Sequence, residues 1–84
     1  MINISSLLFE NALNKSKLGF NAIDDGLCEI NFTELKFFDS SAVSVLIGWK
    51  KYAENKGITL RYLNLPAGIL ILAELYGVKS LIEN

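Results

Sequence analysis

The chain is organised around residues 37–49, which read Phe37-Phe38-Asp39-Ser40-Ser41-Ala42-Val43-Ser44-Val45-Leu46-Ile47-Gly48-Trp49. An aromatic pair is followed by an acid and two hydroxyls, and then by an apolar run with small polar gaps. Aspartate and serine are common where helices begin, because their side-chain oxygens accept hydrogen bonds from free backbone N–H groups. We therefore expect a helix from about Ser40 to Asn55, capped by the Ser40 hydroxyl and ended by a left-handed Gly57.

The Ser40 hydroxyl has two interpretations. The plainer one is a helix cap and nothing more, which is the commonest use of a serine at this position. The other is a functional group, because the positive end of the helix dipole also tolerates a phosphate at such a hydroxyl. The position alone does not separate the two.

The rest of the chain alternates between predicted strands and predicted helices. Strands are expected over residues 1–9, 27–32 and 58–63, where apolar residues alternate with polar ones or cluster. Helices are expected over residues 10–23 and 64–77, the first closed by an Asp-Asp-Gly turn and the second opened by Asn-Leu-Pro. Strands and helices in alternation are typical of an α/β fold with a largely parallel sheet. We predict that all 84 residues form one such domain.

The same periodicity predicts which side chains face the core. A lone cysteine in an alternating row is interpreted as a small core residue without chemistry, and the aromatic pair is expected to fill the core at the end of a loop. The inward positions are Ala12, Leu13, Ser16, Phe20 and Ile23 in the first helix, Cys28, Ile30 and Phe32 in the second strand, Phe37 and Phe38, and Leu65, Ile69, Leu72, Ala73 and Tyr76 in the last helix.

Composition excludes several classes of function. The net charge is −1 and the eight basic residues are scattered, so the footprint of a nucleic-acid-binding protein is absent. Without histidine, the usual general base, the Ser–His and Cys–His pairs and most zinc sites are missing. The six glycines stand apart and form no phosphate-binding loop. We expect no enzymatic activity, no cofactor and no metal.

Cysteine content and hydropathy bear on where the protein acts. A single cysteine cannot form an intrachain disulfide, which fits a reducing cytoplasm. No apolar run reaches the roughly 18–20 residues that cross a bilayer, and residues 1–9 lack the basic region and cleavage-like site of a secretion signal. We expect a cytoplasmic protein that does not insert into the membrane.

Two helices carry more apolar surface than one core requires. The positions outside their inward stripes are Val43, Ser44, Ile47, Gly48 and Lys51 in the central helix and Leu70, Ile71 and Leu75 in the last one. Val43 lies on the flank of its stripe and fits core and contact surface equally well. Contiguous exposed apolar surface usually marks an interface. We therefore expect a protein partner or a second copy of the chain.

These motifs resemble those of STAS domains. They are an aromatic residue before Asp39-Ser40-Ser41-Ala42, the place of this motif between a strand and an aliphatic helix, and the distal run Leu72-Ala73-Glu74-Leu75-Tyr76-Gly77-Val78. The resemblance implies the STAS fold, a small, mostly parallel β-sheet with interspersed helices. Family members carry one more strand ahead of the position matched by residues 1–9, so we expect the N-terminal strand to be shortened or missing here. An open sheet edge of that kind can pair with another chain.

Two branches of the family are similar to this chain. One is the MlaB type, a small cytoplasmic subunit that binds the ATPase of a bacterial phospholipid-transport ABC system, and it is matched at residues 8–12 and 73–78. The other comprises anti-sigma-factor antagonists, in which a kinase phosphorylates the first hydroxyl after the aspartate and so switches off binding. That position is Ser40 here.

The helix faces and the resemblance together single out a set of partner-binding or switch residues: Asp39, Ser40, Ser41, Val43, Ser44, Ile47, Lys51, Leu70, Ile71 and Leu75. The implied partner is the ABC ATPase, or an anti-sigma factor and its kinase in the alternative branch. A homodimer through the open sheet edge or the last helix is a further expectation. The ATPase would place the protein at the inner membrane only peripherally.

Overall fold

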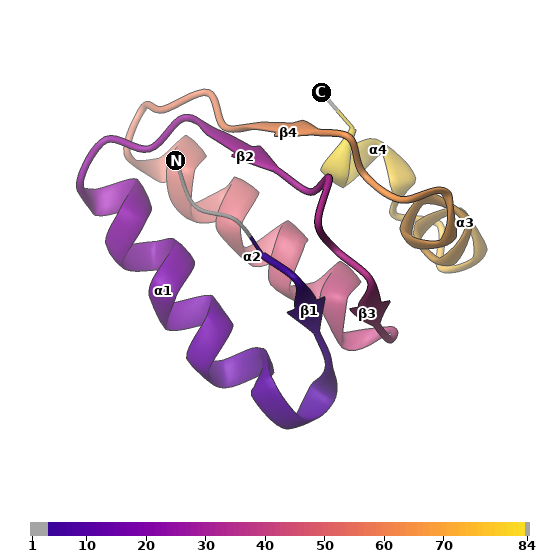
Figure 1. Cartoon of the computed structure of the whole chain (residues 1–84). Helices are drawn as coiled ribbons and strands as arrows, with labels where there is room; N and C mark the ends of the chain where they lie inside the picture. Colours follow the sequence, from indigo (N-terminus) through magenta and orange to yellow (C-terminus); the bar gives the residue numbers. More distant parts are fainter. Residues whose placement is uncertain (1–3, 84) are drawn as a thin grey trace.

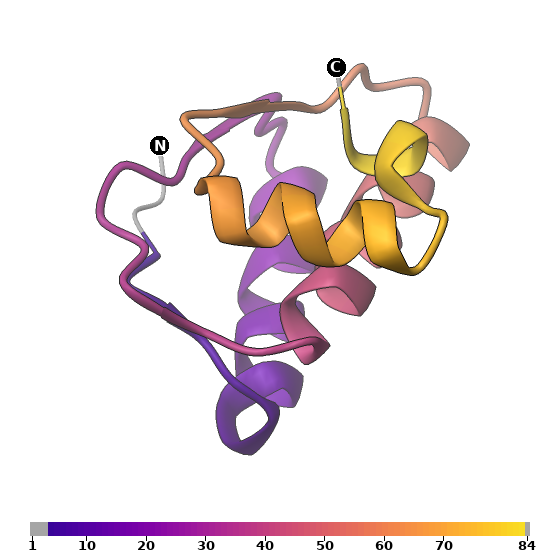
Figure 2. The ribbon, with the colours of Figure 1, turned by 90° about the vertical axis from the view of Figure 1, so that its right-hand side faces the viewer.

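The computed structural model describes residues 4–83, apart from the side chain of Phe9. Its elements are β1 (Ser6–Leu7), the 3-10 turn η1 (Phe9–Asn11), α1 (Ala12–Asp24), β2 (Glu29–Asn31), β3 (Phe37–Phe38), α2 (Ser41–Asn55), β4 (Arg61–Leu63), α3 (Ala67–Leu75) and α4 (Lys79–Ile82). The strands lie on one side of α1 and α2, and α3 and α4 stand beside α2 on the side away from α1 (Figure 1). Turned by 90°, α3 and α4 lie in front of α2 (Figure 2).

The strands form two short parallel pairs. β1 pairs with β3, with Ser6 opposite Phe37, and β2 pairs with β4, with Ile30 opposite Tyr62. Parallel strands joined through helices are what alternating strands and helices produce, so the predicted small, mostly parallel α/β fold is confirmed. Part of the strand predicted over residues 1–9 lies outside the described residues. Within residues 4–83, no strand precedes β1.

The centre of the core is the contact between α1 and α2. Trp49 of α2 is fully buried, and its indole Nε1 donates a hydrogen bond to the Ser16 carbonyl of α1 at 3.1 Å. The indole ring occupies the space in which a side chain of Gly19 would lie: a Cβ built on Gly19 would be 2.1 Å from Trp49 Cε2. The two helices can approach this closely only because residue 19 has no side chain. Their C-terminal halves are joined by the rings of Phe20 and Tyr52, 4.7 Å apart.

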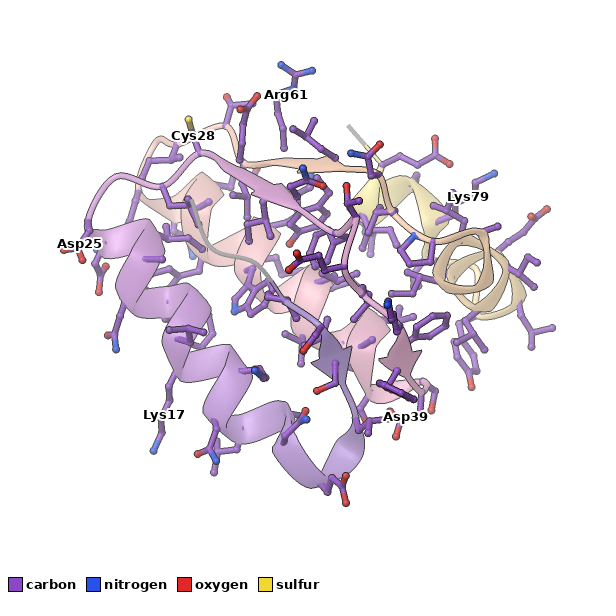
Figure 3. All side chains as sticks on the ribbon, in the orientation of Figure 1. Lys17, Asp25, Cys28, Asp39, Arg61 and Lys79 are labelled. Atoms are coloured by element: carbon purple, nitrogen blue, oxygen red, sulfur yellow. The ribbon has the colours of Figure 1, made fainter. Side chains whose placement is uncertain are left out.

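Four predicted core positions are wrong: Phe37, Cys28 and Leu13, and Tyr76 after the end of α3. Phe37 is exposed and only Phe38 packs against the core, because successive residues of a strand point to opposite faces. Cys28 is exposed and points away from the helices (Figure 3); it precedes the paired segment of β2, so strand alternation does not fix its direction. Leu13 has the right angular position on α1, but it lies in the first turn and is 69% exposed.

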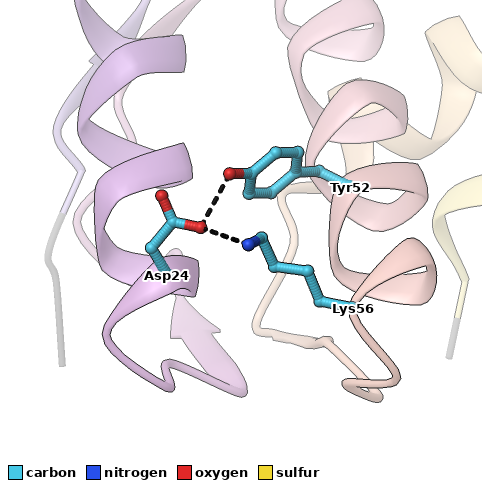
Figure 4. Close-up of polar contacts among 3 residues, drawn as sticks. All are labelled: Asp24, Tyr52 and Lys56. Carbon is cyan, nitrogen blue, oxygen red and sulfur yellow. Dashed lines mark hydrogen bonds and ion pairs between the residues drawn. The ribbon is translucent and has the colours of Figure 1, made fainter.

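A polar cluster joins the C-terminal ends of α1 and α2 (Figure 4). The Tyr52 hydroxyl donates to Asp24 Oδ1 at 2.7 Å, and Lys56 Nζ lies 2.8 Å from the same oxygen. The hydrogen bonds from Lys56 and Tyr52 lower the pKa of Asp24 below its ordinary value of 3.8. The hydrogen bond to Asp24 raises the pKa of Lys56 above 10.5. The cluster therefore favours the charged form of both groups.

These shifts predict how stability depends on pH. The stability that the Asp24 carboxylate contributes is present above pH 3.8. It is lost as the pH falls through the lowered pKa that Asp24 has in the folded protein. The stability that the Lys56 ammonium contributes is present below pH 10.5. It is lost as the pH rises through the raised pKa that Lys56 has in the folded protein. Because both side chains are 42% exposed, solvent screening keeps the effect small. We expect Asp24→Asn to lower the Tm slightly at neutral pH and not at all in strong acid. A Tm difference that persists in acid would contradict this assignment.

Candidate partner-binding site

The first turn of α2 is held by Asp39. Its Oδ1 accepts a hydrogen bond from the Ser41 backbone N–H at 2.9 Å, and its carbonyl oxygen accepts one from the Ala42 N–H at 3.0 Å. The Asp39 N–H donates to the Leu7 carbonyl at 3.2 Å, which ties the start of the helix to β1. In Figure 3, Asp39 lies where β3 gives way to α2. Asp39 therefore has the capping role at this helix.

The prediction that the Ser40 hydroxyl caps α2 is wrong. Ser40 already has helical dihedral angles (φ −62°, ψ −20°), and its side chain makes no capping hydrogen bond. A capping side chain normally reaches back to the helix from a non-helical backbone, and Asp39 supplies that oxygen one residue earlier. The Ser40 side chain is exposed instead. Its position beside the positive end of the helix dipole favours negative charge on the hydroxyl oxygen.

A hollow of about 310 Å³ lies between the outer face of α2 and the turn that joins α3 to α4. Its lining residues carry no charged side chain; they are Ser40, Val43, Ser44, Ile47, Tyr76 and Val78. Gly77 lets the chain turn back here, because its φ of 71° is left-handed. The Val78 N–H then donates to the Ala73 carbonyl at 2.8 Å, as in the turn that commonly ends a helix.

Further exposed apolar side chains stand on α3. Ile71 is 64% exposed and Leu75 is 76% exposed, as their position outside the inward stripe predicts. Tyr76 was expected to face the core and is exposed; it follows the last residue of α3, where the chain is already turning. The inward side of α3 is formed by Ile69 and Ala73, both fully buried.

The predicted site residues lie on α2, on the turn before it and on α3, and they differ in exposure. The exposed ones are Ser40, Ser44, Lys51, Ile71 and Leu75, the half-buried ones are Asp39, Ser41, Ile47 and Leu70, and Val43 is buried. Val43 is only 3% exposed, so it is a core residue that forms the floor of the hollow. We call the set Ser40, Ser44, Ile47, Ile71 and Leu75 the candidate surface.

Sequence reasoning missed two residues of this region. Tyr76 was assigned to the core, and Val78 was assigned no role, yet both line the hollow opposite Ser40. The available signal was Gly77, which marks a reversal of the chain after α3. A reversal alone does not say which helix the returning segment lies against, because that depends on the packing of α3 and α4 on α2.

Two buried or half-buried titratable groups lie at the other end of α2. Burial lowers the pKa of Lys50, and Arg61 adds to this; the Lys50 ammonium lies 4.9 Å from the centre of the Tyr62 ring. Burial also raises the pKa of Tyr62, whose hydroxyl donates to the Leu46 carbonyl at 2.6 Å.

Across residues 4–83, no three or more His, Cys, Asp or Glu side chains gather as a metal site would require. No helix in that range has the length and hydropathy to cross a membrane.

Comparison with known proteins yields one match. A family model described as “MlaB, STAS domain” matches residues 20–83, which include α2, α3, α4 and the whole candidate surface. The stretch at residues 8–12 that is similar to the same branch lies outside the match. No curated protein and no solved structure matches the chain.

Proposed function

This chain belongs to the MlaB-type STAS domain family, and from that premise we propose that it is a non-catalytic interaction subunit. Its partner is the cytoplasmic ATPase of a bacterial ABC phospholipid-transport system, whose assembly and activity it supports. The observation that carries the proposal is the exposed Ser40 hydroxyl at the rim of an uncharged hollow; α3 adds the exposed side chains of Ile71 and Leu75. All of these lie within the part of the chain that matches the family.

The candidate surface has the chemistry of a protein contact. It combines the apolar side chains of Ile47, Ile71 and Leu75 with the hydroxyls of Ser40 and Ser44, the mixture of apolar and polar groups that a typical interface contains. Ser40 and Ser44, both exposed, place two hydroxyls one helical turn apart at the hollow. A bulky uncharged side chain of the ATPase fills the hollow and hydrogen-bonds to these hydroxyls. Side chains that fill such pockets contribute most of the binding energy in many interfaces.

The remaining predicted residues support this contact in different ways. Asp39 and Ser41 form the first turn of α2 and so position the Ser40 hydroxyl. Val43 supports the floor of the hollow from the core. Lys51 is exposed, and a charge at the edge of a contact affects association rate more than affinity. Leu70 is half-buried and packs against the core from α3.

One observation favours a second candidate function. The exposed hydroxyl of Ser40 is accessible to a kinase, which fits an anti-sigma-factor antagonist regulated by phosphorylation at this serine. A phosphate there would add about 1.5–2 negative charges at the contact. In that case the partner is an anti-sigma factor, and the chain purified from its host carries a phosphate on Ser40.

Binding experiments with purified proteins separate the two functions. Titration calorimetry of the full chain with the ATPase of the host's phospholipid-transport system should give a saturable complex. Binding to the host's anti-sigma factor, with none to the ATPase, would reject the proposal in favour of the alternative. Sedimentation of the chain alone reports whether a homodimer competes for the same surface.

Leu75→Lys should weaken ATPase binding by roughly tenfold or more, because truncating or charging a central apolar contact typically removes more than 1 kcal/mol. The Tm should hardly change, since the Leu75 side chain is 76% exposed and surface substitutions are nearly neutral. Leu13→Lys is the matched control: Leu13 is also an exposed helical leucine, at 69%, but it lies on α1. Equal losses of affinity in both variants would show that α3 is not part of the contact.

A further inference from the structure

One part of the candidate surface is Ser40 with Ser44 and Ile47 of α2, and the other part is Ile71 and Leu75 of α3. One segment of chain contacts the starts of both helices. Residues 31–39 lead from β2 through β3 to Asp39, which holds the start of α2. The same segment contacts the connection from β4 to α3 at one end and the first turn of α3 at the other. These two contacts therefore act together with the direct packing of α3 on α2 in holding the two parts of the surface relative to each other.

The first contact is made by Asn64. Its φ of 59° is in the left-handed region, which non-glycine residues rarely occupy. Its side-chain Nδ2 donates to Asn31 Oδ1 at 3.1 Å and to Thr33 Oγ1 at 3.0 Å. Asn31 Oδ1 also accepts from the Thr33 backbone N–H at 2.9 Å. The side chain of Asn64 thus fastens a left-handed turn of the β4–α3 connection to the end of β2.

The second contact is made by Gly68 in the first turn of α3. A Cβ built on Gly68 would be 2.7 Å from Phe38 Cζ and 3.1 Å from Cε2. Phe38 is packed against the core from β3, immediately before Asp39. Because the ring takes the space of the missing side chain, any side chain at residue 68 would require the Phe38 ring or α3 to shift.

We propose that Asn64 and Gly68 are positioning residues for partner binding. They seat α3 on residues 31–39 and so hold its exposed face at a fixed angle to the start of α2. This role rests on the proposed function, since it concerns the geometry of the same contact surface. Neither residue touches the partner.

Gly68→Ala is the decisive change, and Phe38→Leu in the same chain is its compensation. Alanine favours the helix more than glycine does, so Gly68→Ala removes room without weakening α3 itself. The leucine lacks the Cζ and Cε atoms that the new Cβ would meet. Residual dipolar couplings of the α2 and α3 amides should show a changed angle between the helices in Gly68→Ala and a return to the wild-type angle in the double variant. An unchanged angle, with the ring alone moving, would overturn the proposal.

The binding measurement then tests the consequence. Gly68→Ala should weaken ATPase binding by about tenfold, within the range of coupling found between contacting residues. The double variant should bind more tightly than Gly68→Ala, although two residues have been changed. Losses that simply add would overturn the positioning role. If the wild-type chain does not bind the ATPase at all, the proposed function fails, and the dipolar couplings still decide whether Gly68 sets the helix angle.

Asn64 is tested by separating its backbone conformation from its hydrogen bonds. Asn64→Gly keeps easy access to the left-handed region but removes the contacts to Asn31 and Thr33. Hydrogen exchange in the first turn of α3 should become faster in this variant, while exchange in α1 stays unchanged. Wild-type exchange throughout α3 would show that the Asn64 side chain does not hold the helix.

Discussion

Replacing Ser40 with aspartate is expected to abolish binding of the ATPase while leaving the chain folded. The side chain at this position is exposed and makes no capping hydrogen bond that folding would miss. A carboxylate beside the positive end of α2 is acceptable in the free protein. In the complex it would be buried at an uncharged hollow, close to the Asp39 carboxylate. An unpaired charge buried at an interface costs about 2–5 kcal/mol of binding free energy, which raises the Kd by a factor of roughly 30 or more.

Two further variants show whether the added charge, and not the loss of the hydroxyl, causes the loss of affinity in Ser40→Asp. Ser40→Ala removes the hydroxyl without adding charge, and we expect it to keep most of the affinity, because a neutral hydrogen bond contributes about 1 kcal/mol net. Thr59→Asp adds the same charge at an exposed position in the connection between α2 and β4, and it should bind like the wild type. Calorimetry gives the affinities, and thermal melts show that all three variants fold. Wild-type affinity in Ser40→Asp would remove Ser40 from the contact.

Gly19→Ala is expected to be strongly destabilising, although alanine is the better helix former. The new Cβ would lie 2.1–2.5 Å from three atoms of the Trp49 indole, so the buried ring must move. Overpacking of a core typically costs 1–3 kcal/mol. Moving the ring also breaks the hydrogen bond from Trp49 Nε1 to the Ser16 carbonyl, and an unsatisfied buried donor costs about 1–3 kcal/mol. The higher helix propensity of alanine offsets only about 1 kcal/mol of this loss. We expect a net loss of about 2 kcal/mol, or a Tm lower by about 10 °C.

Gly48→Ala is the matched control, since Gly48 is also a helical glycine. A Cβ at Gly48 would meet no atom within 4 Å, so the propensity gain of up to about 1 kcal/mol should appear as a higher Tm. The two substitutions are therefore expected to have opposite signs. A Gly19→Ala variant as stable as Gly48→Ala would mean that the α1–α2 contact adjusts without loss.

Local sequence patterns were sufficient for β2, β4, the three longer helices and part of the candidate site, but not for β3, whose residues Phe37 and Phe38 were expected to end a loop. The periodicity of residues 40–55 predicts α2 to within one residue at its start, and Gly57 and Gly77 have the left-handed φ expected where helices end. Ile71 and Leu75 are exposed, as their angle on α3 indicates. These features follow from bonds and side-chain directions within one element, which a single stretch of sequence already contains.

Tertiary packing alone decided the rest. Periodicity gives the direction of a side chain but not where the covering element ends, so Leu13 and Tyr76, at the two ends of their helices, are exposed although the pattern predicts burial. A glycine in the sequence indicates a low helix propensity, but it does not say which residue will pack against it. Only the fold brings Trp49 against Gly19 and Phe38 against Gly68. The hollow at Ser40 exists because the chain after Gly77 returns to α2. Such contacts join residues far apart in the chain, and their geometry is set by how whole helices pack.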